Sequence, residues 1–250
     1  MFSIIIPTLG LKRKSNKRYF YKKRYDLIDC LTSLKNNYDT TDVQIIIIFN
    51  GCDEKEIKYV LDKFPFVNFS VNRENVGVAR SWNIGSNLSK YENIIFLNDD
   101  CIIKSSIFIK YHEYLNENKD VGIIGPEGSF WKNLRHESYY EAKNIGSSDA
   151  IAGFCFMTRN KTLARLGYFD VAYTPAGYEE IDFCFASKLS GFKNIVWPCD
   201  KIIHNIVHGV SGTKQDITFF DQTISTEVLN NRNKQIFFEK WKNENINSLL

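Results

Sequence analysis

The chain has 250 residues, of which 44% are hydrophobic and 24% charged, as in ordinary soluble globular proteins. This length fits one α/β domain, and the longest apolar runs are too short to cross a bilayer. The N-terminus lacks the basic and apolar regions of a secretion signal, and the scattered cysteines are typical of reduced thiols. We therefore expect a cytoplasmic protein with no membrane-spanning segment.

The net charge of +3 conceals one strongly basic segment. Between Lys12 and Arg24 there are eight Lys or Arg residues and no acidic residue, so the rest of the chain carries a net charge of −5. A nucleic-acid-binding protein usually spreads its basic residues over a whole face of the fold. We therefore expect no nucleic-acid partner, although Tyr19, Phe20 and Tyr21 have side chains that can stack on bases.

Strands and helices alternate over the first hundred residues. Runs of β-branched and aromatic residues predict strands, and apolar residues at helical spacing predict helices. In chain order we expect a strand from Phe2 to Ile6, a helix around Leu27 to Leu34, a strand from Val43 to Phe49, a helix from Glu54 to Phe64, a strand from Val67 to Val71, a helix from Val78 to Leu88 and a strand from Asn93 to Leu97. This alternation predicts an α/β fold with a mostly parallel, doubly wound sheet and helices on both faces. Ligands of such sheets bind beyond the carboxyl ends of the strands.

The second half of the chain is less regular. We expect a helix from Ser105 to Asn116, a strand from Val121 to Ile124, an irregular aromatic-rich stretch from Gly125 to Ser148, a strand from Ile151 to Met157, a helix near Lys161 to Leu166, a helix from Glu179 to Leu189, a strand-like run from Lys201 to Ile203 and a polar helix from Phe219 to the end. The sequence shows no internal repeat and no linker. We therefore expect a single domain.

Two adjacent carboxylates, Asp99 and Asp100, follow Asn98 at the end of a predicted strand. Their mutual repulsion would be offset by a divalent cation bound to a diphosphate, since hard oxygen ligands suit Mg²⁺ or Mn²⁺. A solvated turn explains the same residues, because Asn and Asp favour turns. The motif by itself leaves both interpretations open.

Three acids, Glu179, Glu180 and Asp182, lie at the start of a predicted helix. Acidic residues in a first turn interact favourably with the helix dipole, which is a sufficient explanation for Glu179. The functional interpretation is a general base that deprotonates an acceptor hydroxyl as the hydroxyl attacks a sugar carbon.

A histidine and an arginine complete the set of candidate residues. His204 follows a strand-like run, and His208 lies four residues later; nearby glycines argue against a helical two-histidine metal pair and favour a lone ligand or an ordinary polar residue. Arg80 follows Gly77 near the start of a predicted helix, where a guanidinium suits a phosphate or carboxylate partner.

In this order, the motifs resemble those of glycosyltransferase family 2, and especially its bacterial rhamnosyltransferase-like branch. The matching segments are Ile4 to Thr8, Asn75 to Gly85 with its Asn-x-Gly spacing, Leu97 to Asp100 at the family's DxD-type motif, Gly153 to Arg159, Gly167 to Asp170, Tyr178 to Cys184, and Pro198 with His204. The resemblance extends over about residues 2 to 240.

The resemblance implies a GT-A fold, inversion at the anomeric carbon and a divalent cation, Mn²⁺ or Mg²⁺, on the donor diphosphate. It implies these roles: metal binding by Asp100, Asp99 and His204, donor binding by Thr8, Asn50, Arg80, Asp99 and Asp100, and acid or base catalysis by Glu180 and Asp182. Glu180 stands where the family usually has an aspartate base. The usual aspartate after the second strand is Phe49 here, so recognition of the nucleotide base is expected to differ from the family's or to use Asn50 or Asp53.

The expected function is transfer of a hexosyl or deoxyhexosyl group from a UDP-, dTDP- or GDP-linked donor to a hydroxyl of a glycan or lipid-linked glycan, in bacterial surface polysaccharide or lipopolysaccharide synthesis. Residues 1–100 would form the nucleotide-binding half, 101–218 the acceptor and catalytic half, and 219–250 a C-terminal helical segment. The alternative is a non-catalytic module that binds nucleotide sugars or carbohydrate. Typical members lack the segment from Lys12 to Arg24, which we interpret as contacting a diphosphate, an acidic glycan or the inner face of a membrane, or as a solvated loop.

Overall fold

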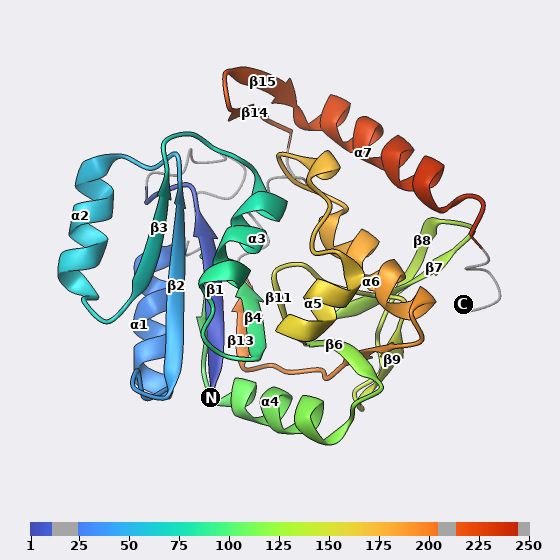
Figure 1. Cartoon of the computed structure of the whole chain (residues 1–250), viewed down its shortest axis with the longest axis horizontal. Helices are drawn as coiled ribbons and strands as arrows, with labels where there is room; N and C mark the ends of the chain where they lie inside the picture. Colours follow the sequence, from blue (N-terminus) through green and yellow to red (C-terminus); the bar gives the residue numbers. More distant parts are fainter. Residues whose placement is uncertain (12–24, 205–213, 245–250) are drawn as a thin grey trace.

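The computed structural model describes residues 1–11, 25–204 and 214–244. A mixed eight-stranded sheet lies between two layers of helices (Figure 1). The strand order is β3-β2-β1-β4-β11-β6-β12-β9. This architecture is the predicted α/β fold.

The first half of the sheet is parallel, as the alternation of strands and helices predicted. It comprises β1 (Phe2–Thr8), β2 (Val43–Asn50), β3 (Asn68–Asn72) and β4 (Asn93–Leu97). The second half comprises β11 (Cys155–Arg159), β6 (Val121–Gly125), β12 (Lys193–Val196) and β9 (Gly146–Ser148). In that half β11 runs antiparallel to both of its neighbours, and β6 and β12 are parallel.

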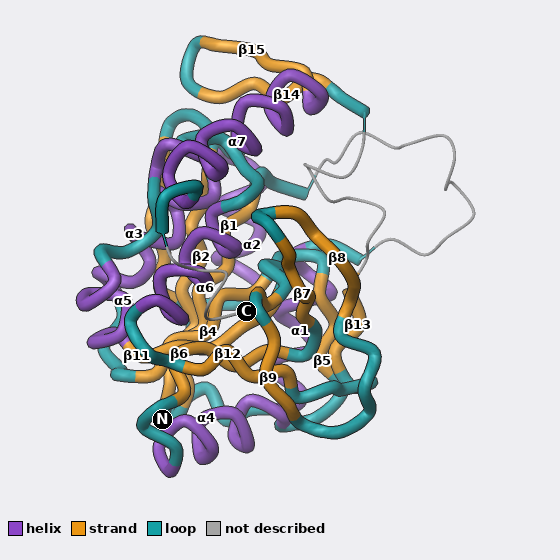
Figure 2. The backbone as a smooth tube through the Cα atoms, turned by 90° about the vertical axis from the view of Figure 1, so that its right-hand side faces the viewer, coloured by secondary structure: helices purple, strands orange, loops and turns teal. Residues whose placement is uncertain are grey.

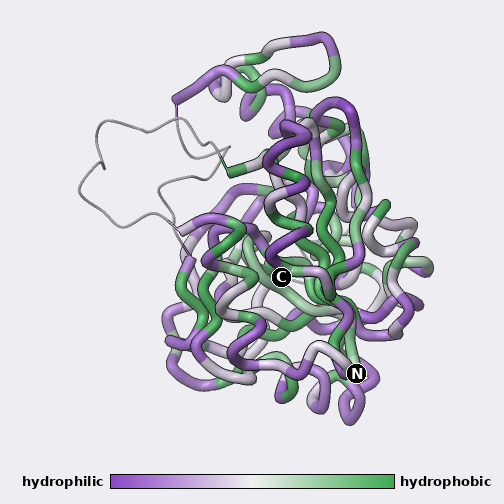
Figure 3. The backbone as a smooth tube through the Cα atoms, turned by 90° about the vertical axis from the view of Figure 1, so that its left-hand side faces the viewer, coloured by the Kyte–Doolittle hydropathy of each residue, from purple (hydrophilic) through white to green (hydrophobic). Residues whose placement is uncertain are grey.

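Helices cover both faces of the sheet. One face carries α1 (Leu27–Asn37), α2 (Glu54–Lys63) and α4 (Ile107–Glu117), and the other carries α3 (Val78–Leu88), α5 (Asn160–Leu166) and α6 (Glu179–Leu189). Because side chains alternate along a strand, Ile4 and Ile6 of β1 enter the first core and Ile5 the second. Figure 3 shows the hydrophobic strand segments in the interior and more hydrophilic segments around them.

The stretch from Gly125 to Ser148 is not irregular, so that prediction was wrong. It contains the hairpin of β7 (Gly128–Lys132) and β8 (Arg135–Tyr139), which β10 (Ala150–Ile151) extends. The hairpin turn places Asn133 and Leu134 at φ 50° and 59°. Two consecutive positive φ angles are typical of a type I′ turn. Leucine is not among the residues that favour such a turn, so the sequence did not predict it.

The C-terminal part also begins differently from the prediction. A hairpin of β14 (Asp216–Phe219) and β15 (Gln222–Ser225) precedes α7 (Thr226–Trp241), so the helix expected from Phe219 starts at Thr226. Ser225 caps that helix by accepting the N–H of Val228. Figure 2 shows the hairpin beyond the N-terminal end of α7.

Three short elements remain. They are β5 (Cys101–Ile103), β13 (Ile202–His204) and the 3₁₀ helix η2 (Val171–Tyr173). The strands β5 and β13 pair with each other away from the main sheet. All six cysteines are free thiols, as expected. Within the described ranges, no helix combines the length and apolarity needed to cross a membrane.

Candidate active site

Two of the predicted site residues meet at the carboxyl ends of neighbouring strands. Thr8 ends β1, and Asp99 follows β4, which is parallel to β1. The Thr8 hydroxyl donates to Asp99 Oδ2 at 2.7 Å, and both side chains are buried. The sheet topology therefore brings together two residues that lie 91 positions apart in the sequence.

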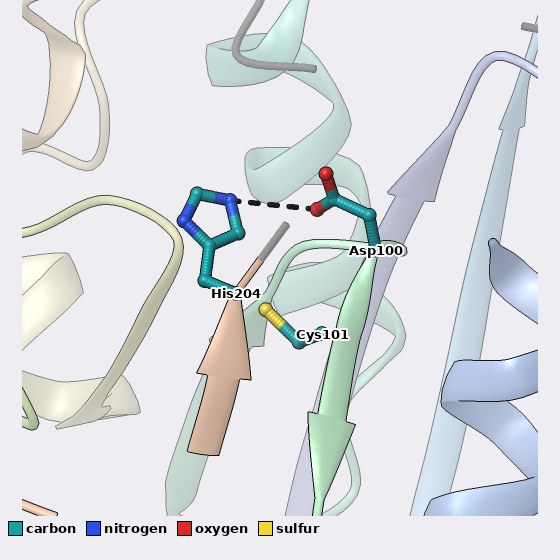
Figure 4. Close-up of side chains that lie close together, drawn as sticks. All are labelled: Asp100, Cys101 and His204. Carbon is teal, nitrogen blue, oxygen red and sulfur yellow. Dashed lines mark ion pairs between the residues drawn. The ribbon is translucent and has the colours of Figure 1, made fainter. Parts of the chain in front are cut away.

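His204 lies beside Asp100. The antiparallel pair β5 and β13 places His204 opposite Cys101, and His204 Nε2 lies 3.5 Å from Asp100 Oδ1. Figure 4 shows the imidazole and the carboxylate pointing toward each other. The Asn98 amide nitrogen is 3.4 Å from the same imidazole nitrogen, and the Phe154 ring stacks on the imidazole at 4.3 Å.

The side chains of Asp100, Cys101 and His204 form a cluster with the chemistry of a metal site. Their potential ligand atoms all lie within 4.8 Å of one another. Burial raises the pKa of the Cys101 thiol well above its ordinary value, helped by neighbouring thiols and by Asp100. A thiol is a soft ligand, so the Asp100 carboxylate and the His204 imidazole are the groups that fit a hard or borderline divalent cation.

Cys101 was expected only as one of the scattered reduced thiols and not as part of a site. Asp99 is not part of this cluster within the described residues; one of its oxygens instead accepts the Thr8 hydroxyl. The predicted metal ligands Asp100 and His204 are therefore together, and Asp99 is adjacent through the chain.

Glu180 lies in the first turn of α6, against the segment that precedes β11. A Cβ atom built on Gly153 would lie 2.9 Å from Glu180 Cδ, so only glycine allows the carboxyl this close. The next residue, Phe154, stacks on His204. This one segment therefore connects the predicted base with the predicted metal cluster.

The Glu180 carboxyl has an altered proton affinity. Burial raises its pKa, and the N–H groups of Glu180, Ile181 and Gly153 donate to it and partly oppose that rise. Its neighbour Glu179 is only 5% exposed, and one of its carboxyl oxygens has no hydrogen-bond partner among the residues that the structure describes. Burial and the nearby charge of Glu180 raise the pKa of Glu179 well above its ordinary value. The helix thus begins with two acids whose ionised forms are costly.

Asp182 has a different environment. Its carboxylate is 4% exposed and accepts from the Tyr173 hydroxyl at 3.0 Å, Trp241 Nε1 at 2.8 Å and Lys240 Nζ at 2.8 Å. Lys240 and Trp241 belong to α7. We infer that Asp182 attaches α7 to α6, and the catalytic role that the family resemblance suggested for it remains a prediction.

Replacing Asp182 by Asn should therefore lower the stability of the fold. We expect a loss of about 1–2 kcal/mol, because a charged hydrogen bond is removed but its partner Lys240 is partly exposed and screened. The melting temperature should fall by about 3–6 °C. The matched control is Asp170→Asn, which breaks the other, more exposed ion pair of Lys240. This variant should lower the melting temperature by less than Asp182→Asn does. If Asp182→Asn loses turnover but keeps its melting temperature, the result would support the predicted catalytic role of Asp182.

Asn50 and Arg80 have structural contacts near the same edge of the sheet. The Asn50 side chain accepts the N–H of Val76 at 2.9 Å and donates to Asn75 Oδ1 at 2.8 Å, which holds the turn before α3. Arg80 donates to Thr174 Oγ1, and its guanidinium lies 5.4 Å from the centre of the Phe220 ring. Donor binding by these two residues remains a prediction.

The cavity between the helices lies away from the Asp100 cluster, and two predicted features fall outside the described residues. A cavity of about 570 Å³ lies between α3, α5, α6 and α7, and Asp182 is the predicted site residue in its lining. It is therefore distinct from the Asp100 cluster. His208 and the segment from Lys12 to Arg24 lie outside the described residues.

The matches to known proteins agree with this geometry. The model of the family described as "Glycosyl transferase family 2" matches residues 19–173, more than half of the chain. The chain belongs to glycosyl transferase family 2. The matched residues include Asp99 and Asp100 and end before Glu180 and His204. The rhamnosyltransferase-like branch remains a prediction. Among curated protein sequences, no significant match was found.

Solved structures of glycosyltransferases share the fold at low sequence identity. GalNAc-T7, crystallised with UDP, GalNAc and Mn²⁺, is 14% identical with a TM-score of 0.65, over 81% of this chain and 43% of its own. The mannosyltransferase PcManGT from Pyrobaculum calidifontis is 12% identical with a TM-score of 0.55, over 79% and 54%. S. aureus TarS 1-349 is 14% identical with a TM-score of 0.55, over 78% and 57%. The chain spans about half the length of these proteins, and the likeness confirms the GT-A fold.

Proposed function

We propose that the chain is an inverting, metal-dependent glycosyltransferase that moves a sugar from a nucleotide-diphosphate donor to a hydroxyl of a glycan or lipid-linked glycan. The observation that carries the proposal is the position of Glu180. Its carboxyl lies against Gly153, and the following residue stacks on His204 of the Asp100 cluster. A base and a candidate cation site thus lie on two sides of one short segment.

The chemistry follows from these residues. Glu180 in its ionised form accepts the proton of the acceptor hydroxyl, whose oxygen bonds to the anomeric carbon as the bond to the diphosphate breaks. One carboxylate on the attacking side suits a single displacement, which inverts the anomeric centre. A divalent cation held by Asp100 and His204 would neutralise part of the diphosphate charge. Two of the fold relatives were solved with Mn²⁺, which supports a divalent cation here, Mn²⁺ or Mg²⁺.

We propose a chemical class for the donor and a pathway for the acceptor. The fold relatives were solved with UDP and GalNAc, with GDP-Man and with UDP-GlcNAc, so a nucleotide-linked hexose is the donor class that we propose. A role in bacterial surface polysaccharide or lipopolysaccharide synthesis, in the cytoplasm and at the inner face of the membrane, is the pathway and location that we propose from the family resemblance.

A thermal-shift screen against UDP, GDP, dTDP and CMP, each with Mn²⁺ or with EDTA, tests the proposal. At a nucleotide concentration about 100 times Kd, binding adds about 2.7 kcal/mol to the free energy of unfolding, which raises the melting temperature by about 5–10 °C. We expect one diphosphate to do this only with Mn²⁺. Release of that nucleotide from its sugar, with water as acceptor, should follow. Stabilisation by a nucleotide without any release of sugar would favour a non-catalytic binding module.

A further inference from the structure

The loop that leads into Glu180 is held by one side chain of α7. Asn233 is fully buried, and its Nδ2 donates to the carbonyl oxygens of Tyr173 at 2.9 Å, Ala176 at 3.0 Å and Gly177 at 2.9 Å. Its Oδ1 accepts two hydrogen bonds from Arg232, at 3.1 and 2.9 Å. Both ends of the Asn233 amide are therefore satisfied in a single orientation.

The remaining carbonyl groups of this loop also have donors. Arg232 donates to the oxygen of Thr174, and the N–H of Val78 at the start of α3 donates to the oxygen of Pro175 at 2.9 Å. Each carbonyl from residue 173 to residue 177 thus accepts a hydrogen bond. Four of these five hydrogen bonds are donated by Asn233 and Arg232, so α7 determines the path of the loop.

The end of this loop has an unfavourable backbone conformation. Gly177 has φ 94° and Tyr178 has φ 80°, and Tyr178 caps the helix that carries Glu180. A tyrosine with positive φ is strained, and such a conformation persists only where the surroundings hold it. Glu180 follows two residues later, so a change in the loop would turn its carboxyl away from Gly153.

The opposite side of the loop contacts the predicted donor half. Arg80 donates to Thr174 Oγ1, and a Cβ atom built on Gly77 would lie 2.9 Å from Thr174 Cγ2. The loop is therefore fixed between the turn before α3 and α7. The elements are shown in Figure 1, where α7 runs past α6 on the side away from β1.

We propose that Asn233 is a positioning residue that orients Glu180 for proton transfer. The proposal rests on the proposed function, because it assigns Asn233 a part in that reaction. Asn233 also lies outside residues 19–173, the part of the chain that the family model matches. It acts through the loop, and the reacting atoms do not contact it.

The test compares Asn233→Ala and Asn233→Ser with the matched control Leu229→Ala. Leu229 is a fully buried α7 residue outside the network of loop carbonyls, so its truncation destabilises α7 without removing a loop donor. The probe is nucleotide release with Mn²⁺ from UDP-glucose, UDP-galactose, UDP-GlcNAc, GDP-mannose and dTDP-rhamnose. For the sugar that the wild type cleaves, we expect kcat to fall about 10²-fold in Asn233→Ala and about 10-fold in Asn233→Ser, since small misplacements of a catalytic group have effects of this size. The donor KM should stay within about twofold.

Two outcomes would overturn the proposal. One is a kcat for Asn233→Ala equal to that of Leu229→Ala; the other is a donor KM that rises as steeply as kcat falls. Hydrogen exchange of the amides of residues 173–181 provides a readout that needs no substrate. Faster exchange in Asn233→Ala but not in Leu229→Ala supports the positioning role, and equal exchange rules it out. If the wild type cleaves none of the sugars, the proposed function fails, while the exchange result still decides whether Asn233 holds the loop.

Discussion

Replacing Glu180 by Gln is expected to lower turnover by about 10²–10⁴-fold while leaving nucleotide binding unchanged. Glutamine has the shape of glutamate but accepts no proton from the acceptor hydroxyl. The Asp100 cluster lies beyond Gly153 and Phe154, so the metal-dependent rise in melting temperature should persist. The measurement is nucleotide release under single-turnover conditions together with the thermal shift given by the nucleotide diphosphate.

The pH dependence gives a second expected result for Glu180. A base acts only when ionised, and burial raises the pKa of Glu180 above the value of an ordinary glutamate. As the pH is lowered, turnover should therefore begin to fall at a higher pH than it would with a solvent-exposed glutamate as base. This acid limb of the pH profile should be absent in Glu180→Gln. The charged or titratable groups that face Glu180 are Glu179, Tyr178 and Cys184.

Glu179→Gln is the matched control, since it removes the neighbouring acid and keeps the base. We expect turnover to persist in this variant, because Glu180 keeps its carboxyl and only its neighbour is replaced. If Glu179→Gln abolishes turnover and Glu180→Gln does not, the base is Glu179.

Much of the site could be predicted from short local motifs. Asp99 and Asp100 follow a run of buried apolar residues, and Glu180 follows a turn before a predicted helix, so strand end and helix start are both visible in the sequence. Once the strands are parallel, their carboxyl ends share an edge, which is why Thr8 and Asp99 meet.

Contacts between distant short elements could not be predicted in the same way. His204 reaches Asp100 because β13 pairs with β5, and strands of three residues have too little hydrophobic pattern to show their partner. The contacts of Asp182 with Lys240 and Trp241 could not be predicted, because both partners come from a helix almost sixty residues later. A carboxylate in a helix's first turn has the same appearance in a sequence whether it binds a substrate or attaches another helix.

Replacing Asp100 by Asn is expected to remove the metal dependence of nucleotide binding. Asp100 is 2% exposed, and its carboxylate lies beside His204 with no other acid in the described part of the cluster. An asparagine side chain has one neutral ligand oxygen in place of a charged carboxylate, which weakens binding of a hard divalent cation. Calorimetric titration of Mn²⁺, and of the nucleotide diphosphate with and without Mn²⁺, measures the effect. We expect Mn²⁺ affinity to fall at least about 10-fold, the lower end of the range for a disturbed metal site.

Cys101→Ala is the control that separates a metal ligand from a cluster neighbour. Because Mn²⁺ prefers oxygen and nitrogen ligands to sulfur, removing the Cys101 thiol should cost some packing and leave Mn²⁺ affinity within about twofold of the wild type. A loss of Mn²⁺ binding in Cys101→Ala would mean that the thiolate is a ligand, and a softer metal such as zinc would then suit the site better. Unchanged Mn²⁺ and nucleotide binding in Asp100→Asn would contradict the metal assignment, and the proposed reaction would then depend on Glu180 and donor contacts alone.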